Sequence, residues 1–210
     1  MNIDLNAVRL LGAAQLLVIV GGLITERLLA SAIGSGTISD MLVNISDNLT
    51  RMRISNLAAL AVQSTAIVLM GVLYYVVFSQ EYRIIALVAL GFFLAAAITF
   101  AVSKIGAYAL IPLSQDFVEA GAPESSYFQK LGNFFYYGFD RQGWDIQMLF
   151  MALGLLLVQY LFYISGYIPR ALSIWGLAAI CLLLIPTLLQ LYDRDFLPAA
   201  QILAIPYAPY

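Results

Sequence analysis

Five long apolar runs constrain the fold of this 210-residue chain more than any other feature. A helix needs about 20 mostly apolar residues to cross the hydrocarbon core of a bilayer, and each run comes close to or exceeds that length. Backbone amides and carbonyls find no water inside a bilayer, so the runs must be helices rather than open strands. The runs occupy residues 8–30, 54–78, 84–111, 146–164 and 171–192.

The composition also indicates that most of the chain lies in lipid. Hydrophobic residues make up 62% of the chain and charged residues 10%, whereas soluble domains have about 45–50% and about 25%. Folding in water does not hide so much apolar surface. We therefore predict an all-α polytopic transmembrane helix bundle with five spanning helices, in which residues 1–210 form a single integral membrane domain.

The connections between the runs alternate in length. Residues 31–53 contain "SDMLVNISDNLTRM", whose apolar side chains fall near one face and predict an amphipathic interfacial helix capped by Ser39 or Asp40. Residues 112–145 form a long connection rich in Tyr and Phe, as expected near lipid headgroups. The proline-rich tail, "DRDFLPAAQILAIPYAPY", is expected to be a surface or re-entrant segment.

A short polar break, "FYISGYIPRALSIWG", separates the last two runs. Gly166 suits the left-handed conformation that ends many helices, and Pro169 suits the start of the next helix. Arg170 supplies an interfacial charge. We interpret Ser165, Gly166, Pro169 and Arg170 as a structural hairpin, with a direct functional role as the less favoured alternative.

Four stretches of the chain resemble a bacterial membrane family called domain of unknown function 4386. They read "RLLGAAQLLVIVGGLITERLL", "RMRISNLAAL", "VLYYVVFSQEYRIIALVALGFFLAAAI" and "YLFYISGYIPRALSIWG". The last is the most specific, since family members have a similar Ser-Gly-x-x-Pro-Arg hairpin. The resemblance covers roughly residues 9–184, and it implies about six helices with no established activity.

The chain also departs from that family. Members often have a His before the fourth helix, a His within it, and an Arg and a Glu in the third helix. The matching stretches here, "NFFYYGFD", "LFMALGLLLVQ" and "LGFFLAAAI", lack these residues, and the chain has no His at all. The sixth family helix is reduced to the proline-rich tail. A chain without His lacks the usual general base near neutral pH and the commonest metal ligand.

Ionisable side chains at membrane depth are costly, and few occur in the runs. Glu26, Lys104, Arg141 and Asp145 should all come to the membrane face of the long connections if helix directions alternate. We predict that Glu26 and Lys104 approach each other or share a neighbour such as Asp145. Snorkelling and structural pairing are the favoured interpretation of this candidate intramembrane polar cluster, ahead of a functional site.

Uncharged polar residues also fall within the runs. Hydrogen bonds between helices would account for them without a function. The single cysteine, Cys181, is interpreted as a small buried hydrophobe. The uncharged polar residues are Gln15, Gln63, Ser64, Thr65, Thr99 and Gln159.

The leading functional hypothesis is a non-enzymatic accessory or structural subunit that packs against a larger membrane complex. We predict no catalytic residue, no metal and no cofactor, although bound lipid is compatible with the pattern. The expected partners are membrane lipid and other membrane subunits, not nucleic acid. One alternative is a small transporter or ligand-binding bundle that uses the face of Glu26, Lys104 and Asp145. An intramembrane enzyme using Asp140, Asp145 and Glu26 ranks lowest.

The expected location is the bacterial inner membrane, with the N-terminus in the cytoplasm. The first run has no preceding basic segment or cleavage site, so we expect it to remain as a span. The short connections carry Arg83 and Arg170, while the long ones carry more Lys and Arg in total. The positive-inside rule therefore gives conflicting counts for the orientation.

Overall fold

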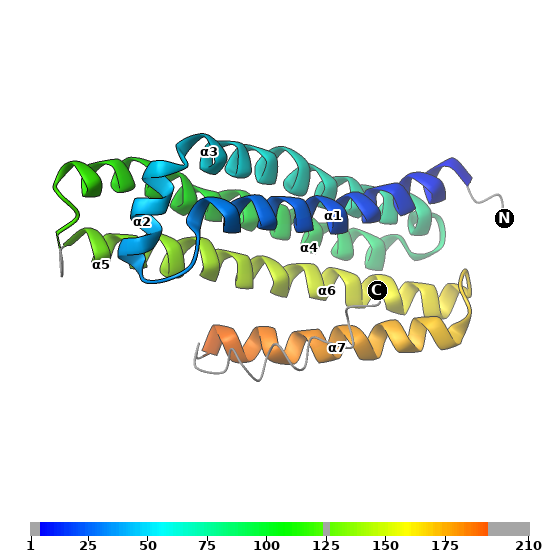
Figure 1. Cartoon of the computed structure of the whole chain (residues 1–210). Coiled ribbons are helices and arrows are strands. Elements are labelled where there is room, and N and C mark those ends of the chain that lie inside the picture. The colour runs from blue at the N-terminus through cyan, green and yellow to red at the C-terminus, as the bar shows by residue number, and fades with distance from the viewer. Residues whose placement is uncertain (1–4, 124–126, 193–210) are drawn as a thin grey trace. The chain divides into compact units, whose positions relative to one another are not determined.

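A computed structural model describes residues 5–123 and 127–192, and every element of regular structure within those ranges is a helix (Figure 1). The predicted all-α fold is confirmed. The proline-rich tail lies outside the described residues. The elements are α1 (Leu5–Ile33), α2 (Ile38–Asp47), α3 (Leu49–Ala58), the π-helix η1 (Ala59–Ser64), α4 (Thr65–Glu119), α5 (Tyr127–Asn133), the π-helix η2 (Phe134–Arg141), α6 (Gln142–Ser165) and α7 (Arg170–Tyr192).

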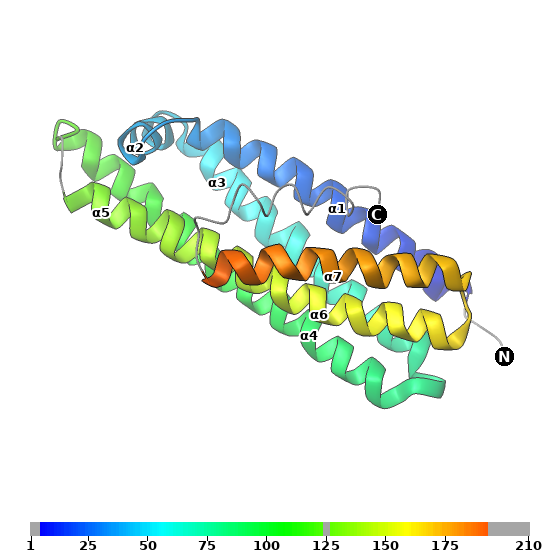
Figure 2. The same cartoon turned by 90° about the horizontal axis from the view of Figure 1, so that it is seen from below.

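Four continuous helical stretches in the described chain are long and apolar enough to cross a membrane, which supports an integral membrane protein. The longest, Leu49–Glu119, has 71 residues. Tyr82 interrupts it with non-helical backbone angles, φ −123° and ψ 42°. The α4 ribbon turns back on itself in both views (Figures 1 and 2). The expected short connection is therefore a kink at one residue rather than a loop.

The expected long connection over residues 112–145 is also mostly helical. Helix α4 continues through Pro112 to Glu119, and a second helical stretch runs from Tyr127 through η2 to Ser165. Proline in a helix interior removes one backbone hydrogen bond but does not always end the helix. The stretch from Tyr127 to Trp144 contains no proline at all, so nothing in it stops the helix before α6.

Contacts divide the chain into two compact units. Unit 1 comprises Met1–Ala14, Ile67–Ala97 and Asp145–Tyr210, and unit 2 comprises Gln15–Ala66 and Ile98–Trp144. The unit boundaries fall inside helices α1, α4 and α6. A single domain over residues 1–210 stays a prediction.

Aromatic rings and glycine notches hold unit 1 together. A Cβ added at Gly71 would lie 2.7 Å from the Cβ of Phe93, and one at Gly154 would lie 3.2 Å from the Phe93 ring. The Tyr74 ring stacks on Phe93 with centroids 5.7 Å apart. Because Phe93 fills the space beside both glycines, the two arms of α4 and helix α6 pack closely.

The turn between α6 and α7 lies where the sequence predicts it, and the two helices run side by side from it (Figure 2). Gly166 adopts φ 68°, in the left-handed region. Its N–H donates to the Phe162 carbonyl at 3.1 Å, which closes the last turn of α6. Pro169 directly precedes α7, as its fixed φ favours.

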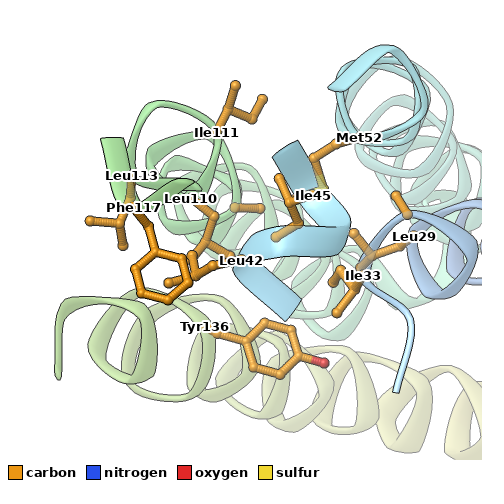
Figure 3. Close-up of a cluster of buried hydrophobic side chains, with 12 residues drawn as sticks. Leu29, Ile33, Leu42, Ile45, Met52, Leu110, Ile111, Leu113, Phe117 and Tyr136 are labelled. Atoms are coloured by element: carbon orange, nitrogen blue, oxygen red, sulfur yellow. The ribbon is translucent and has the colours of Figure 1, made fainter. Parts of the chain in front are cut away.

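A buried apolar cluster forms the core of unit 2 (Figure 3). Leu42 and Ile45 of α2 are each only 1% exposed. The predicted amphipathic helix is present as α2, but its apolar face packs against protein rather than lipid. The other members come from α1, α3, α4 and η2: Leu29, Ala32, Ile33, Met52, Ala107, Leu110, Ile111, Leu113, Phe117 and Tyr136.

Thr37, rather than Ser39 or Asp40, is the N-cap of α2. Its hydroxyl accepts from the Asp40 N–H, and the Asp40 carboxylate accepts from the Thr37 N–H at 2.8 Å. This capping box satisfies two helix-terminal donors. The side-chain hydrogen bond from Thr37 to the carboxylate, with the backbone bond second, lowers the pKa of Asp40.

Candidate functional site

The π-helix η2 sends two adjacent charged residues to two different partners. Lys104 Nζ of α4 donates to Asp140 Oδ1 at 2.7 Å. Arg141 Nη1 donates to Glu26 Oε1 of α1 at 2.9 Å. We call Glu26, Lys104, Asp140 and Arg141 the charge cluster. Its formal charge is zero, and all four residues belong to unit 2.

The inner pair of the charge cluster is almost completely buried. The side chains of Lys104 and Asp140 are 6% and 3% exposed. The ammonium also lies 5.1 Å from the centroid of the Phe100 ring. Two charges withdrawn from solvent in this way depend on each other, since removing either one strands its partner.

Glycines let α4 and the η2–α6 segment come close enough to form that pair. A Cβ added at Gly106 would lie 2.7 Å from the Phe135 carbonyl oxygen. A Cβ added at Gly143 would overlap the Ser103 side chain, one residue before Lys104. The absence of side chains at both positions thus brings the backbone of η2 within reach of Lys104.

The outer pair remains partly open to its surroundings. The side chains of Arg141 and Glu26 are 35% and 43% exposed. Arg141 Nη2 also donates to the Tyr136 hydroxyl at 3.0 Å, and its guanidinium carbon lies 5.2 Å from the centroid of the Tyr136 ring. Residues five apart share one face of a π-helix, so η2 stacks Arg141 on Tyr136.

The predicted pair of Glu26 and Lys104 is wrong. Lys104 binds Asp140, and Glu26 binds Arg141. Asp145 lies in the first turn of α6 and is not a member of these two pairs, so a neighbour shared by Glu26 and Lys104 stays a prediction. Alternating helix directions bring Glu26 and Lys104 to one membrane face, but they carry no information about the direction in which each side chain points.

Several uncharged polar side chains lack the partners that the sequence analysis expected. The Oε1 atoms of Gln63 and Gln159 and the Oγ atom of Ser64 are buried without a hydrogen bond in the described chain. Gln63 instead packs on α1, where a Cβ at Gly22 would lie 3.4 Å from its amide. Cys181 is exposed rather than buried, because it lies on an outward face of α7.

An apolar crevice lies beside the charge cluster, and Tyr136, whose hydroxyl accepts from Arg141, lines it. The space between its walls is too narrow for a water molecule. Among residues 5–123 and 127–192, no three His, Cys, Asp or Glu side chains gather in a way that would hold a metal ion. The crevice is lined by Ile33, Ile38, Met41, Leu42, Ile45, Leu110 and Tyr136.

The comparisons with known proteins give one match. The sequence profile of a family described as domain of unknown function DUF4386 matches residues 10–209. No curated protein and no solved structure matches the chain. Because the profile covers nearly the whole chain, from the first apolar run into the proline-rich tail, the protein belongs to the DUF4386 family.

Proposed function

We propose that the protein is a non-enzymatic accessory subunit of a membrane complex, and that it binds its partner through an aromatic face on α5 and η2. The observation that carries this proposal is the exposure of three rings on one continuous helical stretch. Tyr127, Phe134 and Tyr137 are 63%, 57% and 41% exposed. We call these three residues the aromatic face.

The depth of the aromatic face favours a protein partner over lipid. The helical stretch Tyr127–Ser165 is continuous, and Ser165 adjoins the polar turn at its other end. At about 1.5 Å per residue, Tyr137 lies about 42 Å and Tyr127 about 57 Å along the helix from Ser165. The hydrocarbon core is about 30 Å thick, and about 40–45 Å with both headgroup layers. With Ser165 at one edge of the hydrocarbon core, the far headgroup layer ends about 35–38 Å along the helix, so the aromatic face begins just outside the headgroups.

Aromatic rings that are exposed to water outside the bilayer indicate a surface that a partner buries. Aromatic belts at headgroup depth are common in membrane proteins, and a helix tilt of about 20° shortens the projected distances by less than a tenth. Tyr127 still projects beyond the headgroups. Apolar patches exposed to water mark interaction sites, and Tyr and Phe are enriched in the cores of protein interfaces. A second membrane protein with an extramembrane surface is the partner that fits.

Copurification with a matched control tests this proposal. The test variant replaces Tyr127, Phe134 and Tyr137 with Ala, and the control replaces the exposed apolar residues Leu87 and Ile98 of α4 with Ala. We expect the wild-type protein and the control to copurify the same partner in mild detergent, and the test variant to lose it. A wild-type protein that purifies alone, or a control that loses the partner equally, would refute the proposal.

We further propose that the chain crosses the membrane five times, with Leu49–Glu119 crossing twice. Its 71 residues correspond to about 107 Å of helix, more than three times the thickness of the hydrocarbon core. The break at Tyr82 supplies the reversal. Each arm, before and after Tyr82, is long enough to span and to project beyond the bilayer.

The proposed location remains the bacterial inner membrane with the N-terminus in the cytoplasm. The positive-inside rule also gives an argument for the reverse orientation, with the N-terminus outside the cytoplasm. Four basic residues lie on the side of the long connections: Arg27, Arg51, Arg53 and Lys130. Labelling with a membrane-impermeant maleimide decides between the two. Because Cys181 is exposed, single cysteines at Ser165 and Asp47 are placed in a Cys181→Ala background. Labelling of intact cells only at Ser165 would reverse the orientation.

A small transporter is the second candidate, and the buried Lys104–Asp140 pair favours it. Ionisable residues inside membrane proteins often mark ion or proton paths. Uptake into proteoliposomes that stops with Lys104→Met while the variant stays folded would support transport. An intramembrane enzyme with Asp140 as its acid is disfavoured, because that carboxylate is only 3% exposed and is already bonded to the Lys104 ammonium.

A further inference from the structure

We infer that Glu26 and Arg141 bind the headgroup of a zwitterionic phospholipid that carries a primary ammonium, of the phosphatidylethanolamine class. The Arg141 guanidinium would donate to the lipid phosphate, and the Glu26 carboxylate would accept from the lipid ammonium. This site is separate from the aromatic face, and it does not depend on the proposed role as an accessory subunit.

Both members of the pair keep bonding capacity after they bind each other. The carboxylate uses Oε1 for its bond with Arg141, and a carboxylate has about four acceptor positions on its two oxygens. The guanidinium has five N–H donors, of which the Arg141 bonds engage Nη1 and Nη2 toward Glu26 and Tyr136. Exposures of 43% and 35% leave both groups accessible from outside.

The depth of the pair places it among lipid headgroups. Arg141 lies 24 residues before Ser165 on the continuous stretch Tyr127–Ser165, which is about 36 Å of helix. With Ser165 at one edge of a hydrocarbon core of about 30 Å, Arg141 lies a few ångströms beyond the other edge. Glu26 shares that depth because it is bonded to Arg141. A lipid phosphate and amine occupy the same layer.

The charges of the site match a neutral zwitterion better than an anion. The Glu26–Arg141 pair has no net charge, and the buried Lys104–Asp140 pair adds none. The anionic phosphatidylglycerol headgroup would satisfy Arg141, but it has no cation for the Glu26 carboxylate. A choline headgroup has a cation without N–H donors. Only the primary ammonium supplies both the charge and the hydrogen bonds that the carboxylate accepts.

Tyr136 orients the guanidinium before a lipid arrives. Its ring lies under Arg141 and its hydroxyl accepts from Nη2 at 3.0 Å. Tyr136 is itself only 9% exposed and belongs to the apolar core of unit 2. A side chain held in this way loses little conformational entropy when it binds a ligand.

Native mass spectrometry of the full-length protein provides the test. The protein is released from membranes containing equal amounts of phosphatidylethanolamine, phosphatidylcholine and phosphatidylglycerol, and the retained lipids are counted. We expect up to about fivefold more phosphatidylethanolamine than either other lipid, the equivalent of one exposed ion pair. A preference for phosphatidylglycerol, or no preference, would overturn the inference.

Three variants assign the preference to its residues. Glu26→Gln should remove the discrimination between ethanolamine and choline lipids, and Arg141→Lys should weaken retention of all three lipids while keeping the ion pair. Arg27 is exposed and adjacent in the sequence, so Arg27→Gln is the matched control and should leave the preference unchanged. If Glu26→Gln keeps the preference, or if Arg27→Gln abolishes it, the site is not this pair. Should Glu26→Gln not fold, Arg141→Lys and Arg27→Gln still decide the assignment.

Discussion

The contacts within unit 1 differ in kind from the contacts within unit 2. Unit 1 relies on rings that fill glycine notches, such as Phe93 beside Gly71 and Gly154. Unit 2 has an apolar core of similar character, and it also contains the ion pairs Lys104–Asp140 and Glu26–Arg141. The contrast teaches that a mostly apolar chain can combine ring packing in one unit with ion pairs in the other.

The two units also differ in the type of helix that they contain. Both π-helices, η1 and η2, belong to unit 2, and η2 carries Asp140 and Arg141. A π-helix is rare and is frequently found at functional sites. In η2 it gives Arg141 the support of Tyr136 and gives Asp140 the buried ammonium of Lys104.

The largest effect expected from a single substitution is in the inner ion pair of unit 2. Lys104→Met leaves the Asp140 carboxylate buried without a counterion and should cost about 3–5 kcal/mol of stability. The double variant Lys104→Met with Asp140→Asn removes both charges and should recover most of that loss. Thermal unfolding in detergent measures both variants. Equal losses in the single and double variants would show that the pair does not stabilise unit 2.

A close glycine contact in unit 1 should give the next largest effect. Gly71→Ala places a methyl group 2.7 Å from the Phe93 Cβ, and overpacking of this kind costs about 1–3 kcal/mol. Gly91 lies in the same helix with nothing within 4 Å of an added Cβ. Gly91→Ala is therefore the control, and it should be neutral or stabilising. A lower unfolding temperature for Gly91→Ala than for Gly71→Ala would contradict the packing argument.

The lengths of the apolar runs predicted the helices but not what joins them. Residues 146–164 and 171–192 fall within α6 and α7, and Gly166 marks the turn between them. The sequence did not predict the π-helix η2, because an aromatic stretch such as "NFFYYGF" is compatible with both a loop at the headgroups and a helix. Its conformation depends on contacts with α4 that no local pattern contains, such as that of Gly106 with Phe135.

The sequence could not predict which charged residues form ion pairs, for a similar reason. Hydropathy and alternating helix directions placed Glu26 and Lys104 near one face of the membrane. The direction of each side chain depends on the rotation of its helix, which is set by close contacts such as Ser103 with Gly143. Asp140, the partner of Lys104, entered the sequence analysis only as a candidate acid in an expected loop.

The outer ion pair should matter much less for stability than the inner one. Glu26→Gln removes a carboxylate that is 43% exposed, and an exposed pair is worth at most about 1 kcal/mol. Arg141 keeps its bond to the Tyr136 hydroxyl, so no buried charge is stranded. Thermal unfolding should shift by far less than for Lys104→Met. A comparable shift would mean that the two pairs act as one buried network.

The smallest effect concerns the capping box of α2, at the exposed edge of unit 2. Hydrogen bonds from Thr37 depress the pKa of Asp40 in the folded state, so the ionised carboxylate stabilises the start of α2. That contribution is complete above the unfolded pKa of about 3.9 and is lost as the pH falls through the lower folded value. A nitroxide at Ser46, in a Cys181→Ala background, should therefore become more mobile in acid. Asp40→Asn should abolish this change, because Asn does not titrate, while the exposed Asp47→Asn in the same helix should retain it. If Asp47→Asn rather than Asp40→Asn removes the transition, the capping box is not its origin.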